Sequence, residues 1–541
     1  MILFIKRITV LTLFFCISSA ADKDIVIHGL EMLDEDSEII LLLDRLYVSS
    51  GQLPPSVGSF TTYADVRESF EQWLEKNQEN SANLQMIIVK ITKILERVVD
   101  RDFDLSLKSF QPTIEGTVGI DYLFHQNLYD ADSVSNFFNV FKDRDFITKY
   151  DQRENFIDVR IKSSYWNYFF FSSRFGLKED WSNLDIRESH YPRDFHELDA
   201  NFNQKSVFTF RFNPITIISG RDRVTMGLGE HGKLLISHEL PPLDVFRFSV
   251  KFGKHIRFYD FITPLNNIST RLLTEEMRPK YLLAHRMEFD FTRRLRIAVN
   301  EMLILNSYLK WNYLNPFLVF HNVTNANNTN IFTAIDFEYL FSNAVKSYLT
   351  VAIDEIDFFA VEPTLSRESR LAMGYHFGTK WYNPLNLPNS FLLLELVKLD
   401  KWLYNYDETG NQDLTYTYIE TIDYPEERTF YRFIGHYLGS NAWAAFIDFG
   451  INRLTLSYQH IEQGEVLLLE PAWSEHGGVP VEIKDILGLQ YENTLLDGKI
   501  SLTSRLFLTH VENFHHSGGI TKTYPEFWIS LGYRILYLDR F

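Results

Sequence analysis

The sequence predicts an all-β transmembrane barrel of about 18 antiparallel strands with a small N-terminal helical bundle. Many segments after residue 105 alternate apolar and polar residues, which is the period of a β-strand. The chain also holds 46 Phe and 28 Tyr beside 23% charged residues. No stretch after residue 20 approaches the ~18 consecutive apolar residues of a membrane helix. A barrel reconciles these observations, because aromatic residues can face lipid while charged residues line the lumen.

Residues 1–20 have the pattern of a secretory signal peptide. Two basic residues precede an apolar run, and small residues at 18–21 suit cleavage. A lipoprotein signal would use Cys16, but Phe14 and Phe15 stand where such a signal has small residues. Cleavage would remove the only cysteine, so we expect an exported protein without disulfides. The formal net charge of -18 argues against nucleic-acid binding.

Residues 21–104 are expected to form a periplasmic helical bundle. Apolar residues recur with helical spacing in segments 39–46, 66–74 and 84–98. Gly51 and the two prolines after it end the first helix. Thr62 and Asp65 resemble a capping box at the start of the second. Three short amphipathic helices bury little core alone, so we expect them to rest on the larger domain.

The barrel is expected over residues 105–541, and residues 281–292 (YLLAHRMEFDFT) show its strand pattern most clearly. Residues 246–252 and 294–299 alternate in the same way, with basic residues on one face. A basic side chain facing the lipid midplane would cost about 2 to 4 kcal/mol, so these faces should point inward. Strand-plus-loop units of about 24 residues give about 18 strands. A soluble β-sandwich or solenoid would not explain the terminal strand together with the signal peptide.

The chain ends in a strand-like segment, EFWISLGYRILYLDRF. A strand at this place needs a neighbour on each side, since a bare edge invites aggregation. Tyr533, Ile535, Tyr537 and Phe541 share one face and are interpreted as a signal for the barrel-insertion machinery. Asp539 interrupts that face. We expect deletion of Phe541 to impair membrane assembly, and replacement of Asp539 by Leu to be tolerated.

One stretch is more specific than periodicity. Residues 218–237 read ISGRDRVTMGLGEHGKLLIS, and AHRMEF, VNEMLIL and YLNPF follow at 284–289, 299–305 and 313–317. In their order and spacing these segments resemble the capsule-assembly Wzi family of outer-membrane proteins. Met226 departs from the pattern, because a Trp is expected before the glycine. The positions that match are Gly220, Arg221, Gly227, Gly229, Leu234, Ser237, His285, Arg286, Glu288, Glu301, Leu314, Asn315 and Pro316.

The resemblance implies an 18-stranded outer-membrane barrel closed by the helical bundle on its periplasmic side. It implies a lectin-like protein without enzymatic activity that associates exopolysaccharide or capsule with the cell surface, with membrane lipids as its other partners and with no cofactor. The alternative is an outer-membrane diffusion channel or solute transporter. The two differ in the lumen, which should be filled in the first and conducting in the second. Deletion of residues 30–100 is expected to open a closed barrel.

Charged residues are the first candidates for the lumen or for glycan contact, because forked hydrogen bonds suit uronic acids and phosphates. The alternative is a ladder of ion pairs that stiffens a filled lumen. Gly227 and Gly229 are expected to make a tight turn, since no Lys-Ser or Lys-Thr pair of a phosphate-binding loop follows. The charged candidates are Arg221, Arg223, Arg286, Glu288, Asp290 and Glu301.

Residues 400–413 (DKWLYNYDETGNQD) are the second candidate, because sugar rings pack on aromatic faces while their hydroxyls need polar partners. Trp402, Tyr404, Tyr406 and Asp407 are the residues proposed for contact. An aromatic girdle at the membrane interface would explain the three aromatic residues equally well. No metal site is expected, since adjacent histidines such as those at 515 and 516 point to opposite faces of an extended chain.

Overall fold

The computed structural model describes residues 27–33, 37–56, 61–77, 82–96, 98–99, 111–125, 155–165, 168–179, 189–190, 198–199, 204–265, 279–322, 328–356, 371–405, 414–422, 428–465, 478–496 and 499–538.

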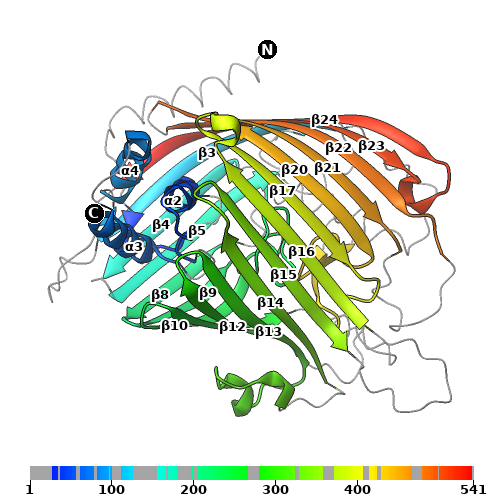
Figure 1. Ribbon diagram of the computed structural model, residues 1–541, viewed down its shortest axis with the longest axis horizontal. Coiled ribbons are helices and arrows are strands. Elements are labelled where there is room, and N and C mark those ends of the chain that lie inside the picture. The colour runs from blue at the N-terminus through cyan, green and yellow to red at the C-terminus, as the bar shows by residue number, and fades with distance from the viewer. Residues whose placement is uncertain are drawn as a thin grey trace.

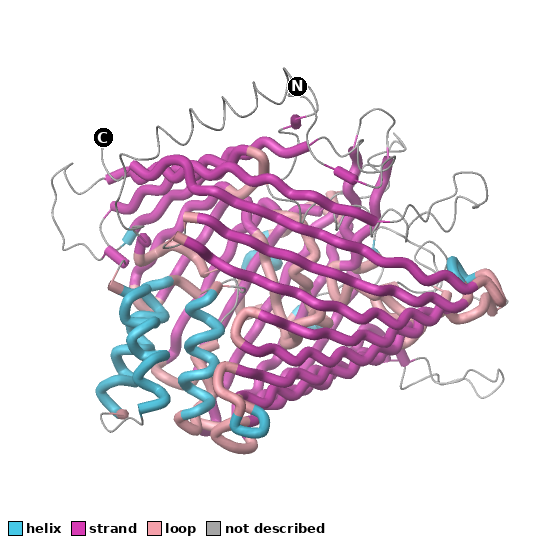
Figure 2. Tube along the Cα trace, turned by 90° about the horizontal axis from the view of Figure 1, so that it is seen from above, coloured by secondary structure: helices cyan, strands magenta, loops and turns pink. Residues whose placement is uncertain are grey.

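Eighteen antiparallel strands close into a barrel, which confirms the predicted fold class (Figures 1 and 2). The strands follow one another round the barrel in chain order. The two-residue strands β6 (Ser189–His190) and β7 (Leu198–Asp199) add short pairings to β3 and β5. The eighteen are β3 (Gln111–His125), β4 (Ile157–Tyr165), β5 (Phe169–Glu179), β8 (Ser206–Phe212), β9 (Ile215–Asp222), β10 (Leu243–Phe252), β11 (Ile256–Leu265), β12 (Lys280–Thr292), β13 (Leu295–Asn306), β14 (Thr329–Leu340), β15 (Val345–Ile356), β16 (Leu371–Tyr382), β17 (Ser390–Leu399), β20 (Ala442–Ile451), β21 (Leu454–Gln463), β22 (Glu482–Leu495), β23 (Ile500–Glu512) and β24 (Thr521–Leu538).

The last strand has a neighbour on each side, as its sequence pattern predicts. Residues 521–533 of β24 pair with β23, with Leu506 opposite Phe527. On its other edge it pairs with β3, with Tyr533 opposite Val118. This second pairing closes the barrel, so the terminal strand leaves no bare edge.

The two faces of each strand divide as the alternation predicts. In β10, Phe246 is exposed on the outer face, while the Arg247 guanidinium is buried and pairs with Asp222 of β9. Arg286 of β12 and Arg296 of β13 also face inward and are buried. Because the inner face carries the basic residues, the outer face is left to apolar side chains that suit lipid.

The barrel has one end of short turns and one end of long loops. Residues 253–255, 293–294, 341–344 and 452–453 are short turns at the first end. Residues 223–242, 307–328 and 400–441 are long connections at the second. We call these the short-turn end and the long-loop end.

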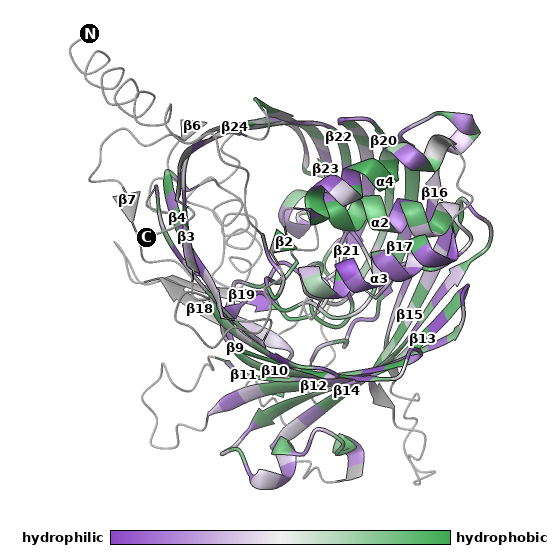
Figure 3. Ribbon diagram, turned by 90° about the vertical axis from the view of Figure 1, so that its left-hand side faces the viewer, coloured by the Kyte–Doolittle hydropathy of each residue, from purple (hydrophilic) through white to green (hydrophobic). Residues whose placement is uncertain are grey.

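Three helices lie at the short-turn end, inside the outline of the ring of strands (Figure 3). They are α2 (Glu38–Ser49), α3 (Tyr63–Lys76) and α4 (Ala82–Leu95). Thr62 and Asp65 form the predicted capping box at the start of α3. The apolar stripes pack together in one core that includes Leu43, Phe70 and Ile91. Among the described residues, no helix has the length and apolar character to cross a membrane.

A pair of two-residue strands, β1 (Ile27–His28) and β2 (Val98–Val99), joins the two ends of this helical segment. His28 lies 2.8 Å from the Ser164 hydroxyl of β4 and 3.2 Å from the Thr113 hydroxyl of β3. The helical bundle is therefore fixed to the barrel wall at its first described residues as well as through its helices.

Candidate functional site in the barrel lumen

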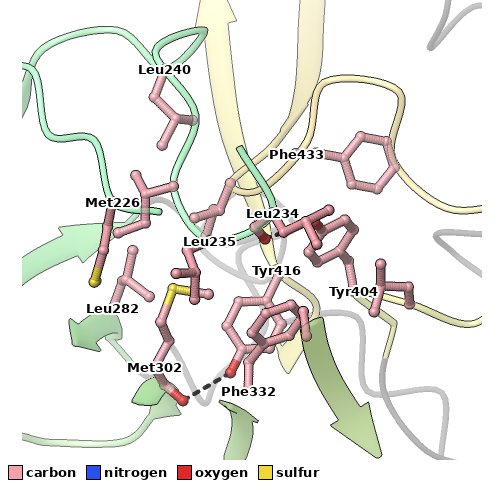
Figure 4. Packing of buried hydrophobic residues seen from close by; sticks show 14 of the residues in the cluster. Met226, Leu234, Leu235, Leu240, Leu282, Met302, Phe332, Tyr404, Tyr416 and Phe433 are labelled. Carbon is pink, nitrogen blue, oxygen red and sulfur yellow. Dashed lines mark hydrogen bonds between the residues drawn. The ribbon is translucent and has the colours of Figure 1, made fainter. Parts of the chain in front are cut away.

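Two long connections turn inward from the long-loop end and pack against each other inside the barrel. We call their described parts, residues 223–242, 401–405, 414–422 and 428–441, the plug. The plug includes a hairpin of β18 (Thr417–Ile422) and β19 (Arg428–Phe433). Its apolar residues form one core with inward residues of the wall (Figure 4). Leu234, Leu235, Tyr404 and Tyr416 are wholly buried in this core.

Hydrogen bonds join the parts of the plug to one another. The Ser237 amide donates to the Ile434 carbonyl at 2.8 Å, and the Ile434 amide donates to the Tyr416 carbonyl at 3.0 Å. The Tyr404 hydroxyl donates to the Leu234 carbonyl at 2.7 Å. These bonds satisfy backbone polar groups that are buried away from water, so the plug is a folded unit.

Further hydrogen bonds join the plug to the wall. The Lys280 ammonium of β12 donates to the Thr415 and Thr417 carbonyls at 2.9 and 3.1 Å. The Asn330 side chain of β14 donates to the carbonyls of Asn405 and Leu414 at 3.1 and 3.0 Å. The plug is thereby held to the inner wall near the long-loop end.

Three glycines of the plug adopt backbone conformations that other residues rarely adopt. Gly227, Gly229 and Gly232 have φ angles of 102°, 126° and 145°. A Cβ on Gly229 would lie 2.1 Å from the Gly232 carbonyl oxygen and 2.2 Å from the His376 ring. Residues 227–235 form a bend closed by the pairing of Met226 with Ile236, and glycine is required where this bend presses against the wall.

The turn also holds a buried carboxylate. The amides of Glu230 and His231 donate to the Glu395 carboxylate of β17 at 2.7 and 2.9 Å. The Tyr348 hydroxyl donates to the same carboxylate, and the His376 ring lies 3.2 Å from it. Sequence reasoning missed this cluster. Its one visible signal is Glu395 itself, a single acid in the apolar strand FLLLELVKL.

A layer of ion pairs lies inside the wall nearer the short-turn end. The Arg286 guanidinium contacts Glu288 at 2.7 Å and also pairs with Asp336 of β14. The Asp290 carboxylate accepts hydrogen bonds from the guanidinium groups of Arg257 and Arg296, at 3.0 and 2.7 Å. Three predicted residues, Arg286, Glu288 and Asp290, are thus brought together as a ladder of ion pairs.

The helical segment covers this layer from the short-turn end. The Ser56 hydroxyl donates to Glu288 at 2.8 Å, and Arg296 donates to the Pro54 carbonyl at 2.8 Å. Asp44 of α2 pairs with Lys346 of β15 at 2.6 Å. The described lumen is therefore layered, with helices, ion pairs and plug following one another from the short-turn end toward the long-loop end.

Asp65 fixes α3 to the other side of the barrel. Its carboxylate lies 3.0 Å from Arg211 and 2.6 Å from Lys251. Burial alone would raise the pKa of Asp65, but these two cations and the Thr62 amide hold the pKa below its ordinary value. The carboxylate is therefore charged at neutral pH and joins α3 to β10.

The wall from β21 to β24 is polar on its inner face. Pairing places Gln490 of β22 beside Arg505 of β23, and Arg505 beside Trp528 of β24. The Arg505 guanidinium lies 5.7 Å from the Trp528 ring centroid. Gln490 and Arg505 are half-buried, in contrast to the buried apolar residues that face the plug from β12 to β14. The Trp528 ring is itself buried, so Gln490 and Arg505 are the side chains that could exchange hydrogen bonds with sugar hydroxyls.

Other predicted residues lie outside the lumen or within the plug. Arg221 is on the outer face of β9, where it pairs with Asp244 at 2.6 Å, and Arg223 is exposed just after that strand. Glu301 is on the outer face of β13. Tyr404 is in the plug core, and Trp402 is half-buried beside Lys401. Tyr406 and Asp407 lie outside the described residues.

The matched motif positions other than Arg286 and Glu288 fall in three places. Gly220 lies in β9, with a φ of 129°, where a Cβ would lie 2.2 Å from the Ser206 carbonyl oxygen of β8. Ser237 is buried in the plug. His285 and Glu301 lie on the outer wall beneath Phe320, and Asn315 and Pro316 lie in residues 307–322, which cover β12 and β13. The order of the motifs along the sequence did not reveal that this segment packs on the wall.

The residues of the expected insertion signal lie in or after β24. Tyr533 is half-buried and pairs with Ile500 and Val118. Ile535 and Tyr537 lie within the strand. Phe541 and Asp539 lie outside the described residues, so the role of this signal stays a prediction.

Comparison with known proteins supports the fold. No family model and no curated protein sequence matches the chain. Among solved structures, the chain is similar to Wzi of Escherichia coli, a carbohydrate-binding outer-membrane β-barrel involved in group 1 capsule assembly. The identity is 10%, the TM-score is 0.54, and the match covers 93% of this chain and 99% of Wzi.

A second similar structure is OccK3 (OpdO) of Pseudomonas aeruginosa. Its identity is 9%, its TM-score is 0.42, and the match covers 80% of this chain and 96% of OccK3. The resemblance drawn from the sequence and the likeness to Wzi agree, and at this identity they show one shared fold, the outer-membrane β-barrel.

Proposed function

We propose that this protein is a lectin-like outer-membrane barrel that associates exopolysaccharide or capsule with the cell surface and has no enzymatic activity. Short turns face the periplasm and long loops face the exterior in bacterial outer-membrane barrels. By this rule the three helices lie on the periplasmic side of the barrel. The plug then enters the lumen from the extracellular side. The similarity to Wzi, a carbohydrate-binding barrel, supports the same proposal.

The observation that carries the proposal is the plug. A channel needs a continuous aqueous path, whereas here Leu234, Tyr404 and Tyr416 form a buried apolar core with wall residues such as Phe332 and Met302. Helices and ion pairs follow behind it. A lumen filled in this way by the described residues suits binding at a surface better than passage of solutes.

The inner wall of β21 to β24 is the place we propose for glycan contact. The Arg505 guanidinium can donate forked hydrogen bonds to an acidic sugar, and Gln490 beside it can donate and accept. Trp402, in the described part of the plug, and Tyr406, outside the described residues, remain proposed glycan contacts. The predicted lumen residues Arg286, Glu288 and Asp290 would act in this scheme as support beneath the plug.

The proposal is tested by measuring conductance and glycan binding on the same refolded protein. Reconstitution in planar bilayers should give no steady large conductance, and acidic exopolysaccharide should bind in solution. Arg505→Ala should weaken that binding by about tenfold, since a charged hydrogen bond contributes on the order of 1.4 kcal/mol or more. Leu506→Ala, at the adjacent outward position, is the control and should leave binding unchanged.

The alternative function, a diffusion channel or solute transporter, predicts the opposite pair of results. Steady large conductance of the wild-type protein without glycan binding would overturn the proposal. A closed barrel that binds no glycan would also count against it and would leave a structural role for the surface protein.

A further inference from the structure

Residues 307–322, which connect β13 to β14, fold back over the outside of the barrel (Figure 1). We call them the strap. They contain two short turns of 3-10 helix, Trp311–Leu314 and Phe320–Asn322. Tyr313 and Phe320 are buried against Leu283, Leu303 and Leu305, which lie on the outer faces of β12 and β13. The strap therefore covers wall that would otherwise meet lipid.

Beneath the strap lies a row of ionisable side chains on outward positions. Glu301 accepts hydrogen bonds from the amides of Phe320 and His321, at 2.9 and 3.3 Å, and lies 2.8 Å from the His321 ring. His285 lies 3.0 Å from Asp260 of β11, and its ring stacks on Phe320 at 4.2 Å. We call these contacts the latch.

An outward carboxylate is unusual at this depth of a barrel wall, because transfer of a charged group into lipid is unfavourable by several kcal/mol. Glu301 is five residues before the end of β13. The strap compensates Glu301 with two backbone donors and an imidazole, and it covers His285 with an aromatic ring. Polar groups of the strap therefore meet the polar side chain of Glu301 on the wall, and the Phe320 ring covers His285. These contacts, the latch, hold the strap against the barrel.

The outer surface of the strap exposes several large apolar side chains beside the polar residues Lys310, Asn312, Asn315 and His321. Trp311 is 89% exposed, Tyr308 72% and Phe317 58%. Leu314 and Val319 are exposed beside them. A loop in water would not be expected to present this surface. It continues the lipid-facing wall, where Val299 and Phe337 are exposed on neighbouring strands.

We propose that the strap is a membrane anchor, seated in the lipid leaflet at the long-loop end and fixed to the barrel by the latch. Trp311 and Tyr308 would lie at the boundary between headgroups and acyl chains, where amphipathic aromatic rings are favoured. Lys310 is exposed between them and reaches the phosphates of the headgroups. The occupant of this surface is a lipid leaflet, to which the apolar strap and the adjoining wall present one continuous face.

The location of the Trp311 side chain in the lipid is tested by fluorescence quenching of the full-length protein in liposomes with brominated acyl chains. The difference in emission between wild type and Trp311→Phe isolates Trp311 among nine tryptophans. Brominated lipid should quench most of this difference, and aqueous iodide little of it. Trp73→Phe, which removes a buried tryptophan of α3, is the control and should not reduce the lipid-quenched component. Iodide quenching with no effect of brominated lipid would overturn the proposal.

The latch is tested separately. In liposomes, trypsin should cleave wild-type protein slowly after Lys310, and Glu301→Ala should raise the cleavage rate several-fold because the strap loses three hydrogen-bond contacts. Glu512→Ala is the control, because it removes an exposed carboxylate of β23 that lies 3.9 Å from the His510 ring. It should leave the cleavage rate after Lys310 unchanged. Equal rates for wild type and Glu301→Ala would overturn the latch.

A second copy of the chain is the other possible occupant. If sedimentation in detergent gives a dimer that Trp311→Phe converts to a monomer, the surface is a protein interface and the proposal is wrong. Because none of these measurements involves glycan, they can fail while glycan association stands.

Discussion

Arg286 shows how one side chain can hold several strands of the barrel together. It contacts Glu288 on its own strand, Asn300 on β13 and Asp336 on β14. All four side chains are buried. From the sequence, an arginine two residues from a glutamate could equally belong to a glycan site. Its burial and its three contacts favour the ladder of ion pairs over direct contact with a glycan.

Removal of this guanidinium should be strongly destabilising. Arg286→Ala leaves two carboxylates buried without their main cation, and loss of one member of a buried pair costs about 3 to 5 kcal/mol. Arg221→Ala is the matched control, because its pair with Asp244 is exposed and contributes about 0 to 1 kcal/mol. Urea unfolding of the refolded variants in lipid measures both. Similar losses for the two variants would contradict the assignment of Arg286 to a buried network.

Gly229 offers a second test at the scale of one residue. Gly229→Ala places a Cβ against the Gly232 carbonyl and the His376 ring in a left-handed conformation, and we expect a loss of about 2 to 4 kcal/mol. Gly478→Ala, with no atom near its Cβ, should change stability by less than about 0.5 kcal/mol. The unfolding transition measures this difference. If Gly229→Ala unfolds like wild type, the turn does not press against the wall as described.

At the scale of elements, the strands and helices follow from local pattern. Alternation in residues 281–292 predicts β12 and its inward Arg286, and the capping box at Thr62 predicts the start of α3. Each of these signals depends on near neighbours in the chain. The order of strands round the barrel adds little further information, because consecutive strands simply pair.

The plug and the strap could not be predicted in this way. Their residues lack a regular period, and they pack on residues of other strands, such as Tyr416 on Met302 and Phe320 on His285. For the same reason the sequence suggests that Tyr404 is a surface aromatic residue, whereas the structure shows it buried. Motif positions gave a partial signal, since His285, Glu301 and Asn315 mark the strap region without showing how it folds.

The contact of α3 with the barrel should depend on pH. The pKa of Asp65 is lower in the folded protein than in the unfolded chain, so its carboxylate stabilises the folded state above about pH 4. This contribution is lost as the pH falls from about 4 through the folded pKa. Hydrogen exchange of α3, corrected for the intrinsic rate at each pH, should therefore accelerate in this range.

In the Asp65→Asn variant, the amide hydrogens of α3 should exchange faster than in wild type at neutral pH. Their corrected exchange rate should not rise further as the pH falls below about 4. Glu75→Gln, an exposed acid on the same helix, should behave like wild type. If wild type and Asp65→Asn show the same pH profile, the ion pairs of Asp65 with Arg211 and Lys251 do not hold the helix.

At the scale of the whole molecule, the lumen is filled from both ends by separate pieces of chain. The helices reach the wall from the short-turn end through Asp44, Pro54 and Asp65. The plug reaches it from the long-loop end through Lys280 and Asn330. The two pieces have separate apolar cores, so neither core depends on the other for its packing.

This division changes the outcome expected from deletion. The sequence alone suggests that deletion of residues 30–100 opens the barrel. With the plug in place, we expect that variant to show conductance close to that of wild type, because the core around Tyr404 and Tyr416 remains. Replacement of both parts of the plug, residues 225–240 and 402–438, by short Gly-Ser linkers should likewise leave the helices in place. Both changes together should produce a large steady conductance in planar bilayers, since a barrel of this many strands encloses an aqueous lumen when emptied. Full opening by the helix deletion alone would show that the plug does not close its half of the lumen.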